Sequence, residues 1–291
     1  MTIQQALESA TERLAVDVHL RETARRDAEL LLMHAAALRR TDLIAYPQRE
    51  LAPVQTAALE TALGRRLRHE PVQYITGTQE FYGLPLKVSA AVLIPRPETE
   101  HLVESVLSVL ENLPHDRPLS IADVGTGSGA IAIALATHLP QASITALDLS
   151  TAALAVAQAN ARTYNLCDRI RFLRSDLLDG LSAQEREGSF DAIVSNPPYV
   201  PTGDHETLHP QVREHEPATA LYAGEDGLSI YRRLIPQAAA ALRPGGLLAM
   251  EFGYGQSEAL DEMLASWQDL FFVNDLQGIP RIVLARRPAV L

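Results

Sequence analysis

The 291-residue sequence predicts an α/β protein in which a small bundle of helices precedes a doubly wound, mostly parallel sheet. Three observations predict this fold class. Apolar residues in 1–70 recur only at helical spacing, whereas short apolar runs and helical stretches alternate after Pro118. A glycine-rich loop also follows the first of those runs, as in sheets that bind a ligand at their carboxyl edge.

Residues 1–70 are expected to form the helical bundle. Apolar residues recur at spacings of three, four and seven residues and so form one face on each of two expected helices. Pro53 stands where it could begin the second of these helices. The faces consist of Ala24, Ala28, Leu31, Ala35 and Leu38, and of Leu59, Leu63 and Leu67. No strand-like alternation interrupts them, so we predict a separate helical domain here.

Short apolar runs in 71–95 are interrupted by Gly77, Gly83 and Pro85, and this pattern predicts a β-hairpin linker. The second domain would then span 96–291. Its first helix would bury Leu102, Val106, Val109 and Leu113.

Strands and helices should alternate through the second domain. We expect strands at 119–124, 143–148, 169–174, 190–195, 247–252, 270–276 and 281–286. Helices are expected near 129–138, 151–165, 228–242 and 256–267, and Pro244-Gly245-Gly246 predicts the end of the third of these. Alternation of this kind indicates parallel strands joined by helical crossovers.

Charge and cysteine content limit the classes of function. Residues 1–70 hold ten basic and ten acidic side chains, so the net charge of −11 arises entirely after them. Such an acidic region would repel a nucleic-acid backbone, and we expect no stable nucleic-acid binding. The single cysteine, Cys167, excludes an internal disulfide and fits a reducing cytoplasm. The N-terminus lacks the pattern of a signal peptide, and the longest wholly apolar run, 130–136, is too short for a membrane span.

A loop after the first expected strand predicts a nucleoside site. It consists of Gly125, Thr126, Gly127, Ser128 and Gly129. Glycines let the backbone approach a ligand closely at the positive end of the following helix. Asp148 ends the next strand, where its carboxylate can accept hydrogen bonds from both ribose hydroxyls. The loop alone leaves a dinucleotide open, because Gly125, Gly127 and Ala130 also fit that fingerprint.

The motif Asn196-Pro197-Pro198-Tyr199 directly follows the strand expected at 190–195, where residues line the ligand crevice of an open sheet. The Asn196 side-chain oxygen and the Pro197 carbonyl could accept both hydrogens of an –NH2 group. Tyr199 offers a flat face for stacking. We therefore predict a substrate site formed by Asn196, Pro197, Pro198 and Tyr199, in which Asn196, Pro197 and Tyr199 are catalytic.

This arrangement suits methyl transfer from S-adenosylmethionine to a planar amide or amine nitrogen. The donor sulfonium already carries the activation, so the protein must chiefly bring the nitrogen in line with the methyl carbon. Acceptors that hold the hydrogens out of plane would also stabilise the positive charge that develops on nitrogen. The location of Asn196 allows it to support the donor as well.

The chain resembles the release factor glutamine methyltransferases, the PrmC family (formerly HemK), from about Pro71 to Arg286. The matching segments are 71–75, 80–83, 93–100, 125–129, 195–199, 216–217, 226–228, 251–253 and 275–281. Many amino-methyltransferases, including adenine DNA enzymes, share Asn-Pro-Pro-Tyr. The Pro-Arg-Pro-Glu-Thr-Glu sequence at 95–100 is far more particular to this family.

The resemblance implies a Rossmann-like, seven-stranded methyltransferase sheet and an N-terminal domain that binds the release factor. It implies methylation of the glutamine amide in the Gly-Gly-Gln motif of class I peptide chain release factors. By position, Gly125–Gly129 and Asp148 would hold S-adenosylmethionine, and Asn196–Tyr199 would hold the glutamine. Leu177 stands where an aromatic residue often packs on the adenine. We expect a cytoplasmic monomer.

Arg96, Glu98 and Thr99 have two interpretations: a gate for cofactor or substrate, or a surface arginine beside a helix capped by Thr99. Histidines at 101, 138, 205, 209 and 215 have spacings that fit no familiar metal site, so we expect solvated loop histidines and no metal.

Four other functions stay open at this point. An adenine-amine methyltransferase acting on DNA or RNA would present the same –NH2 group, but it would need a basic channel. A glutamine methyltransferase that acts on a ribosomal protein would be distinguished from the release factor enzymes only by the 95–100 segment and the N-terminal domain. An NAD-dependent dehydrogenase would explain the glycine loop and Asp148 but not Asn196–Tyr199. A binding module without activity would leave both motifs unused.

Overall fold

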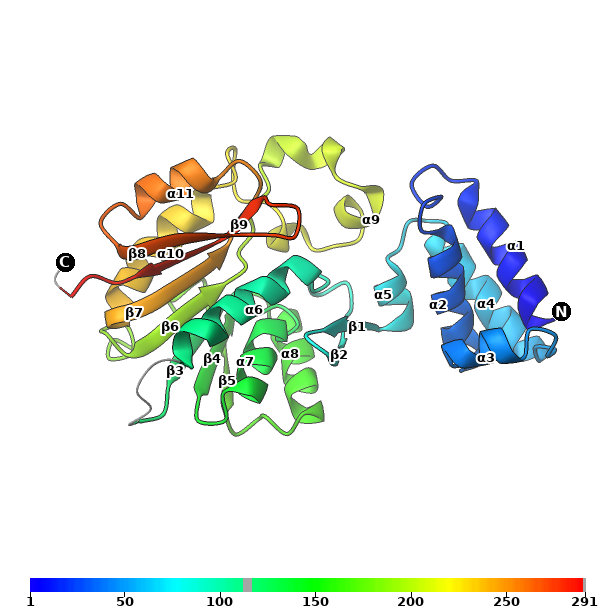
Figure 1. Ribbon diagram of the computed structural model, residues 1–291, viewed down its shortest axis with the longest axis horizontal. Helices are drawn as coiled ribbons and strands as arrows, with labels where there is room; N and C mark the ends of the chain where they lie inside the picture. Colours follow the sequence, from blue (N-terminus) through cyan, green and yellow to red (C-terminus); the bar gives the residue numbers. More distant parts are fainter. Residues whose placement is uncertain (112–116, 290–291) are drawn as a thin grey trace. The chain divides into compact units, whose positions relative to one another are not determined.

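The computed structural model describes residues 1–111 and 117–289 (Figure 1). The chain divides into two compact units. One consists of Met1–Thr78 with Glu206–Glu216, and the other of Gln79–His205 with Pro217–Leu291. We call them the helical unit and the sheet unit. The helical unit thus includes a short segment from the middle of the chain.

The helical unit is built from α1 (Ile3–Ala15), α2 (Ala24–Ala36), α3 (Arg40–Ala45), α4 (Pro53–Arg66) and α5 (Val72–Thr76), with α9 (Pro210–Arg213) from the inserted segment. Helix α1 begins at a capping box, in which the Thr2 side chain accepts from the backbone of Gln5 and the Gln5 side chain accepts from that of Thr2. The predicted faces are buried, with Ala28 and Leu31 of α2 and Leu59 and Leu63 of α4 in one core.

One ion pair is buried inside this unit. Arg66 Nε donates to Asp27 Oδ2 at 2.8 Å, and the two side chains are only 3% and 8% exposed. We expect Arg66→Ala to lower the free energy of unfolding by about 3–5 kcal/mol, because it leaves a buried carboxylate without its partner. Urea denaturation of the full chain measures this loss. The matched control is Arg13→Ala, which removes a 39% exposed arginine paired with Glu60 and should cost less than about 1 kcal/mol. Equal losses in the two variants would contradict the prediction.

Only the middle of the segment 71–95, which we predicted to be a hairpin linker, forms a hairpin. Residues 72–76 form helix α5, because Val72 and Ile75, three residues apart, both pack into the helical core. A helix places such a pair on one face, whereas a strand would place them on opposite faces. The hairpin itself is β1 (Thr78–Phe81) and β2 (Leu84–Lys87).

The predicted seven-stranded sheet is confirmed. Its order is β5-β4-β3-β6-β7-β9-β8. The strands are β3 (Ser120–Val124), β4 (Ser143–Asp148), β5 (Ile170–Arg174), β6 (Phe190–Ser195), β7 (Leu242–Glu251), β8 (Gln268–Asn274) and β9 (Pro280–Arg286). All neighbours pair in parallel except β9, which is antiparallel to both β7 and β8.

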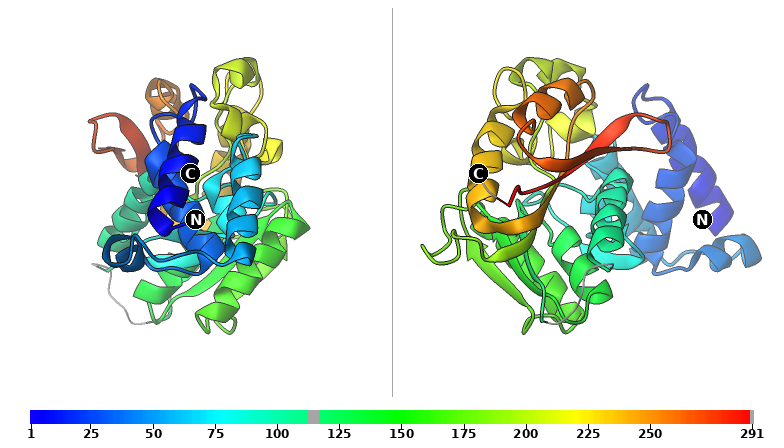
Figure 2. Two further views of the ribbon diagram at one scale, coloured as in Figure 1. Left: turned by 90° about the vertical axis from the view of Figure 1, so that its right-hand side faces the viewer. Right: turned by 60° about the vertical axis from the view of Figure 1, so that its left-hand side comes forward.

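Helices cover both faces of the sheet (Figures 1 and 2). Helices α6 (Pro97–Leu110), α7 (Ala130–His138) and α8 (Thr151–Thr163) bury apolar residues in one core. Helices α10 (Ser229–Ala241) and α11 (Ser257–Met263) contribute to the core of the other face. The predicted face of α6 is buried at Leu102 and Val106, and Leu113 lies outside the described residues.

Three predicted boundaries are wrong, and one of them is that of β8, which spans Gln268–Asn274 instead of 270–276. Pro244-Gly245-Gly246 does not separate a helix from a strand, because β7 already begins at Leu242 and contains all three residues. The backbones of Gly245 and Gly246 exchange hydrogen bonds with that of Arg287, which extends the strand. Helix α11 ends at Met263 instead of 267, and Trp267 is buried against the core just before β8. Nowhere in 1–111 or 117–289 does a helix have the length and hydropathy to cross a bilayer.

Candidate active site

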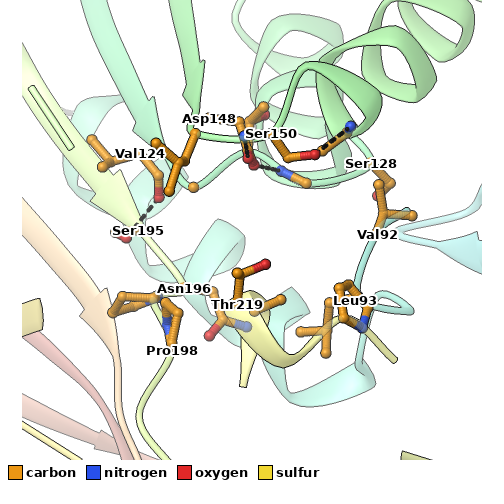
Figure 3. A pocket seen from close by; sticks show the side chains of 18 of the residues that line it. Val92, Leu93, Val124, Ser128, Asp148, Ser150, Ser195, Asn196, Pro198 and Thr219 are labelled. Atoms are coloured by element: carbon orange, nitrogen blue, oxygen red, sulfur yellow. Dashed lines mark hydrogen bonds between the residues drawn. The ribbon is translucent and has the colours of Figure 1, made fainter. Parts of the chain in front are cut away.

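One cavity of about 400 Å³ lies at the carboxyl ends of β3, β4 and β6. All its lining residues belong to the sheet unit. Both predicted motifs reach it: Gly125, Thr126, Gly127, Ser128, Asp148 and Leu177, and Asn196, Pro197 and Pro198. Figure 3 shows Asp148 and Ser150 across the cavity from Asn196 and Pro198. The structure therefore brings the nucleoside loop and the Asn-Pro-Pro segment to one space.

The glycine loop is held by backbone hydrogen bonds. Gly125 N and Thr126 N both donate to Leu147 O, at 2.8 and 2.9 Å. Gly125 and Gly127 have φ values of 75° and 55°, in the left-handed region that glycine tolerates best. Ser128 lines the cavity, and its Oγ is buried without a hydrogen-bond partner among the described residues, so this oxygen can still bond to a polar ligand.

Gly129 does not line the cavity. A Cβ atom there would lie 3.1 Å from Ala157 Cβ and 3.2 Å from Ile133 Cδ1. Gly129 therefore permits close packing between α7 and α8. Its contact with the cofactor stays a prediction, whereas its packing role follows from the geometry.

Asp148 is positioned by two backbone amides. Its Oδ2 accepts from Gly127 N at 2.9 Å, and its Oδ1 accepts from Ser150 N at 2.8 Å. Each oxygen keeps a second lone pair, so the carboxylate can still accept from two ribose hydroxyls. Burial raises the pKa of Asp148, against the effect of these amides.

Asp123 is a residue that the sequence reasoning missed. It is fully buried at the end of β3, and its Oδ2 accepts from Thr126 Oγ1 at 2.6 Å and from Ala132 N at 3.1 Å. Burial raises its pKa to about 7. The carboxylate ties the glycine loop to the start of α7. An acidic residue inside an otherwise apolar strand is unusual, and this feature of the sequence could have indicated Asp123.

Asn196 lies at one end of a buried hydrogen-bond chain. Its Nδ2 donates to Thr99 Oγ1 at 2.9 Å, and Thr99 Oγ1 donates to Glu251 Oε2 at 2.6 Å. Burial raises the pKa of Glu251 to about 7. The sequence reasoning did not assign Glu251 to the site, although a carboxylate in the apolar strand β7 is unusual.

The helix-cap interpretation of Thr99 is wrong. The residue before α6 is Arg96, and the Thr99 hydroxyl bonds to Glu251 instead of to the helix backbone. Arg96 and Thr99 line the cavity, as the gate interpretation requires, whereas Glu98 is not among the lining residues.

Tyr199 does not line the cavity. Its hydroxyl donates to Glu251 Oε1 at 3.3 Å, and its carbonyl accepts from Gln256 Nε2 at 3.0 Å. Burial and the nearby Glu251 raise its pKa. Stacking of a substrate on Tyr199 stays a prediction, whereas its contact with Glu251 is a feature that the sequence did not indicate.

Gly227 provides a test of how tightly the Tyr199 backbone is held. A Cβ atom at Gly227 would lie 2.3 Å from Tyr199 O, and its φ is 72°. We expect Gly227→Ala to displace Tyr199 and reduce methyl transfer more than tenfold, because backbone cannot yield as a side chain can. The control is Gly255→Ala, where φ is 79° but nothing lies within 4 Å. It reproduces the φ strain of about 1 kcal/mol without the clash. If both variants lose activity to a similar extent, the strain of the positive φ explains the loss and the clash with Tyr199 does not.

Two leucines line the cavity together with Asp148 and the glycine loop. Leu177 lines the cavity with φ 49°, and its carbonyl accepts from Ser175 Oγ at 2.6 Å. Leu149, which follows Asp148 and is 55% exposed, also lines it, and the sequence reasoning missed it. Packing of Leu177 on the adenine stays a prediction.

The five histidines named above lie on α6, on α7 and between residues 202 and 216. No group of three or more His, Cys, Asp or Glu side chains in the described part of the chain is arranged to hold an ion. The expectation of solvated loop histidines is wrong: His101 and His138 lie on helices, and all five side chains have a contact within hydrogen-bond distance. In the helical unit, His209 Nε2 lies 3.0 Å from His19 O and His215 Nε2 lies 2.8 Å from Arg68 O. Both nitrogens must donate, since a carbonyl only accepts.

Comparisons with known proteins place the chain in a family. Residues 5–77 match the model described as the PrmC N-terminal domain, and residues 104–213 match the methyltransferase small domain. The release factor glutamine methyltransferase of Koribacter versatilis is 46% identical over 99% of both chains, and that of Moorella thermoacetica 45% over 99% of both. The one from Coxiella burnetii is 40% identical over 99% of both.

The chain belongs to the release factor glutamine methyltransferase family.

Solved structures show that this family member shares its fold with methyltransferases. The catalytic domain of human Mettl16 in complex with MAT2A 3′UTR hairpin 1 matches with a TM-score of 0.57 and 16% identity, covering 87% of this chain and 90% of that one. The 16S rRNA N2 G1207 methyltransferase RsmC of Thermus thermophilus, in complex with AdoMet and guanosine, gives a TM-score of 0.50 at 21% identity, covering 72% and 49%. At these identities the likeness concerns the fold alone.

The cofactor of this methyltransferase is S-adenosylmethionine, which supplies the activated methyl group. The cavity residues fit it in two respects. Ser128 Oγ has no partner among the described residues, and Asp148 has free lone pairs for ribose hydroxyls. The dinucleotide alternative left open by the glycine loop is thereby excluded through the family.

Proposed function

We propose that the protein transfers a methyl group from S-adenosylmethionine to the side-chain amide nitrogen of the glutamine in the Gly-Gly-Gln motif of class I peptide chain release factors. The observation that carries this is one cavity lined by the glycine loop, Asp148 and Asn196. Membership of the family supports the choice of substrate.

The glycine loop, Asp148 and Leu177 form the donor side of the proposed site. Asn196 contacts both the donor and the substrate in this proposal, because it stands where the methyl group and the amide meet. The substrate side consists of Asn196, Pro197, Pro198 and Tyr199. Asn196 Nδ2 is engaged by Thr99, which leaves Oδ1 to accept from the glutamine –NH2. Tyr199 contributes through its contact with Glu251.

In the transfer, the amide nitrogen forms a bond to the methyl carbon while the bond from carbon to sulfur breaks and its electron pair stays on sulfur. The nitrogen gains positive charge as this happens, and the Asn196 oxygen stabilises that charge. The surplus proton leaves the nitrogen afterwards, so no strong base is needed. Position in line with the methyl group is therefore the main contribution of the protein.

The helical unit is the proposed contact surface for the release factor, and we propose a monomer acting in the cytoplasm. The helical unit matches the PrmC N-terminal domain over 5–77, which supports this assignment.

The test is incubation with radiolabelled S-adenosylmethionine and, in parallel, a purified class I release factor, ribosomal proteins, and DNA. The label should appear on the Gly-Gly-Gln glutamine, mapped by peptide mass spectrometry. The control is a release factor whose motif glutamine is replaced by alanine. Label on DNA would support the nucleic-acid methyltransferase instead, and label on a ribosomal protein would support the ribosomal-protein methyltransferase. Label on the control factor would show that the motif glutamine is not the site of methylation, and would overturn the proposal.

A further inference from the structure

An asparagine that must accept from a substrate –NH2 group faces a problem of orientation. Its amide has an oxygen and a nitrogen of similar size, and rotation by 180° exchanges an acceptor for two donors. Only the orientation with Oδ1 toward the substrate can hold the glutamine hydrogens. Some group must therefore select that orientation at Asn196.

We infer that Thr99 and Glu251 are positioning residues that select the orientation of the Asn196 amide, so that its oxygen faces the glutamine of the substrate. This inference rests on the proposed function. Thr99 is 4% exposed and Glu251 is 2% exposed, and they join helix α6 to the end of β7 across 152 residues of sequence.

The direction of the chain follows from what each group can do. An ionised carboxylate only accepts, so the one hydroxyl hydrogen of Thr99 is committed to Glu251 Oε2 at 2.6 Å. Toward Asn196 the Thr99 oxygen can then only accept. The amide end that faces it, at 2.9 Å, must be Nδ2, and Oδ1 points elsewhere.

Glu251 is itself fixed from several sides. The Tyr199 hydroxyl donates to its Oε1 at 3.3 Å, and the Tyr231 hydroxyl of α10 donates to its backbone carbonyl at 2.9 Å. The carboxylate thus holds both ends of the Asn-Pro-Pro-Tyr motif, Asn196 through Thr99 and Tyr199 directly.

The charge of Glu251 matters to this arrangement. Its pKa is raised to about 7, chiefly by burial and also by Glu98 of α6, against the lowering effects of the Thr99 and Tyr199 hydroxyls and of the charge of Arg281 on β9. Below about pH 7 the protonated carboxyl can donate to Thr99. The Thr99 hydrogen is then free to turn toward Asn196, and the selection of the amide orientation is lost.

The first experiment compares Thr99→Val with Thr99→Ser in the full-length protein. Valine keeps the shape but removes the hydroxyl, so kcat with the release factor should fall about tenfold to a hundredfold, while the Kd for S-adenosylmethionine changes less than about threefold. Serine keeps the hydroxyl and should recover most of kcat. Equal kcat values in the two variants, high or low, would overturn the inference.

A second readout does not depend on turnover. In the wild-type protein the side-chain NH2 of Asn196 should show slowed hydrogen exchange by NMR, because it donates to a buried oxygen. Thr99→Val should lose this protection and Thr99→Ser should keep it. If the wild type has protected Asn196 hydrogens but methylates no release factor, the proposed function fails and the orientation of Asn196 stands. Unprotected hydrogens in an active wild type would overturn the inference alone.

The third experiment uses Glu251→Gln, measured as the ratio of variant to wild-type kcat across pH 5.5–9, roughly two units around the Glu251 pKa. Wild-type activity should fall as the pH drops through about 7, since the carboxylate form is lost there. The variant should lack this fall. If kcat falls in the same way at low pH in both proteins, the protonation of Glu251 is not the cause of that fall.

Discussion

Asn196→Ala should abolish methyl transfer to the release factor while leaving the cofactor bound. The Asn196 oxygen is the acceptor proposed to hold the substrate –NH2 group, and removal of one such group from a preorganised site costs about a hundredfold to a thousandfold in kcat. The loss should be in kcat, measured with radiolabelled S-adenosylmethionine. The Kd for the donor, measured by calorimetry, should change less than about threefold.

The matched control is Asn274→Ala, because Asn274 is an exposed asparagine at the end of β8 that does not line the cavity. It should retain wild-type activity. Transfer by Asn196→Ala at more than a tenth of the wild-type rate would contradict the prediction. A parallel loss of donor binding would instead show that Asn196 also supports the donor.

Asp148→Ala should raise the Kd for S-adenosylmethionine about a hundredfold or more. It removes a charged acceptor for two ribose hydroxyls, and each such bond is worth about 1.5–3 kcal/mol. It also leaves Gly127 N and Ser150 N without their acceptor, so the glycine loop loses a constraint. Calorimetry and the rise in Tm on addition of the donor both measure this.

Asp148→Asn separates these two effects, because one side-chain oxygen remains to accept from the loop or from the ribose. Its Kd should lie between those of the wild type and Asp148→Ala. The exposed Asp168→Ala serves as a control for loss of charge alone and should bind the donor normally. Donor binding by Asp148→Ala within threefold of the wild type would exclude Asp148 from the cofactor site.

Local sequence determined the architecture and the place of the site. Alternation of apolar runs and helical faces depends on which side of an element is buried, and burial has a period that a single sequence displays. Strands β4 and β6 therefore coincide with their predicted ranges. The glycine loop and the Asn-Pro-Pro segment both follow buried strands, and in a parallel sheet such segments meet at one edge.

Tertiary structure alone decided which distant side chains meet. Thr99 and Glu251 are 152 residues apart, and no periodicity relates a hydroxyl on α6 to a carboxylate on β7. The same reason accounts for Tyr199, whose ring the sequence assigned to the substrate and whose hydroxyl the fold gives to Glu251. It accounts for α5 as well, because only the helical core shows that Val72 and Ile75 share a face. Side-chain pairing across elements depends on packing in three dimensions, and a sequence pattern records only the burial of each element by itself.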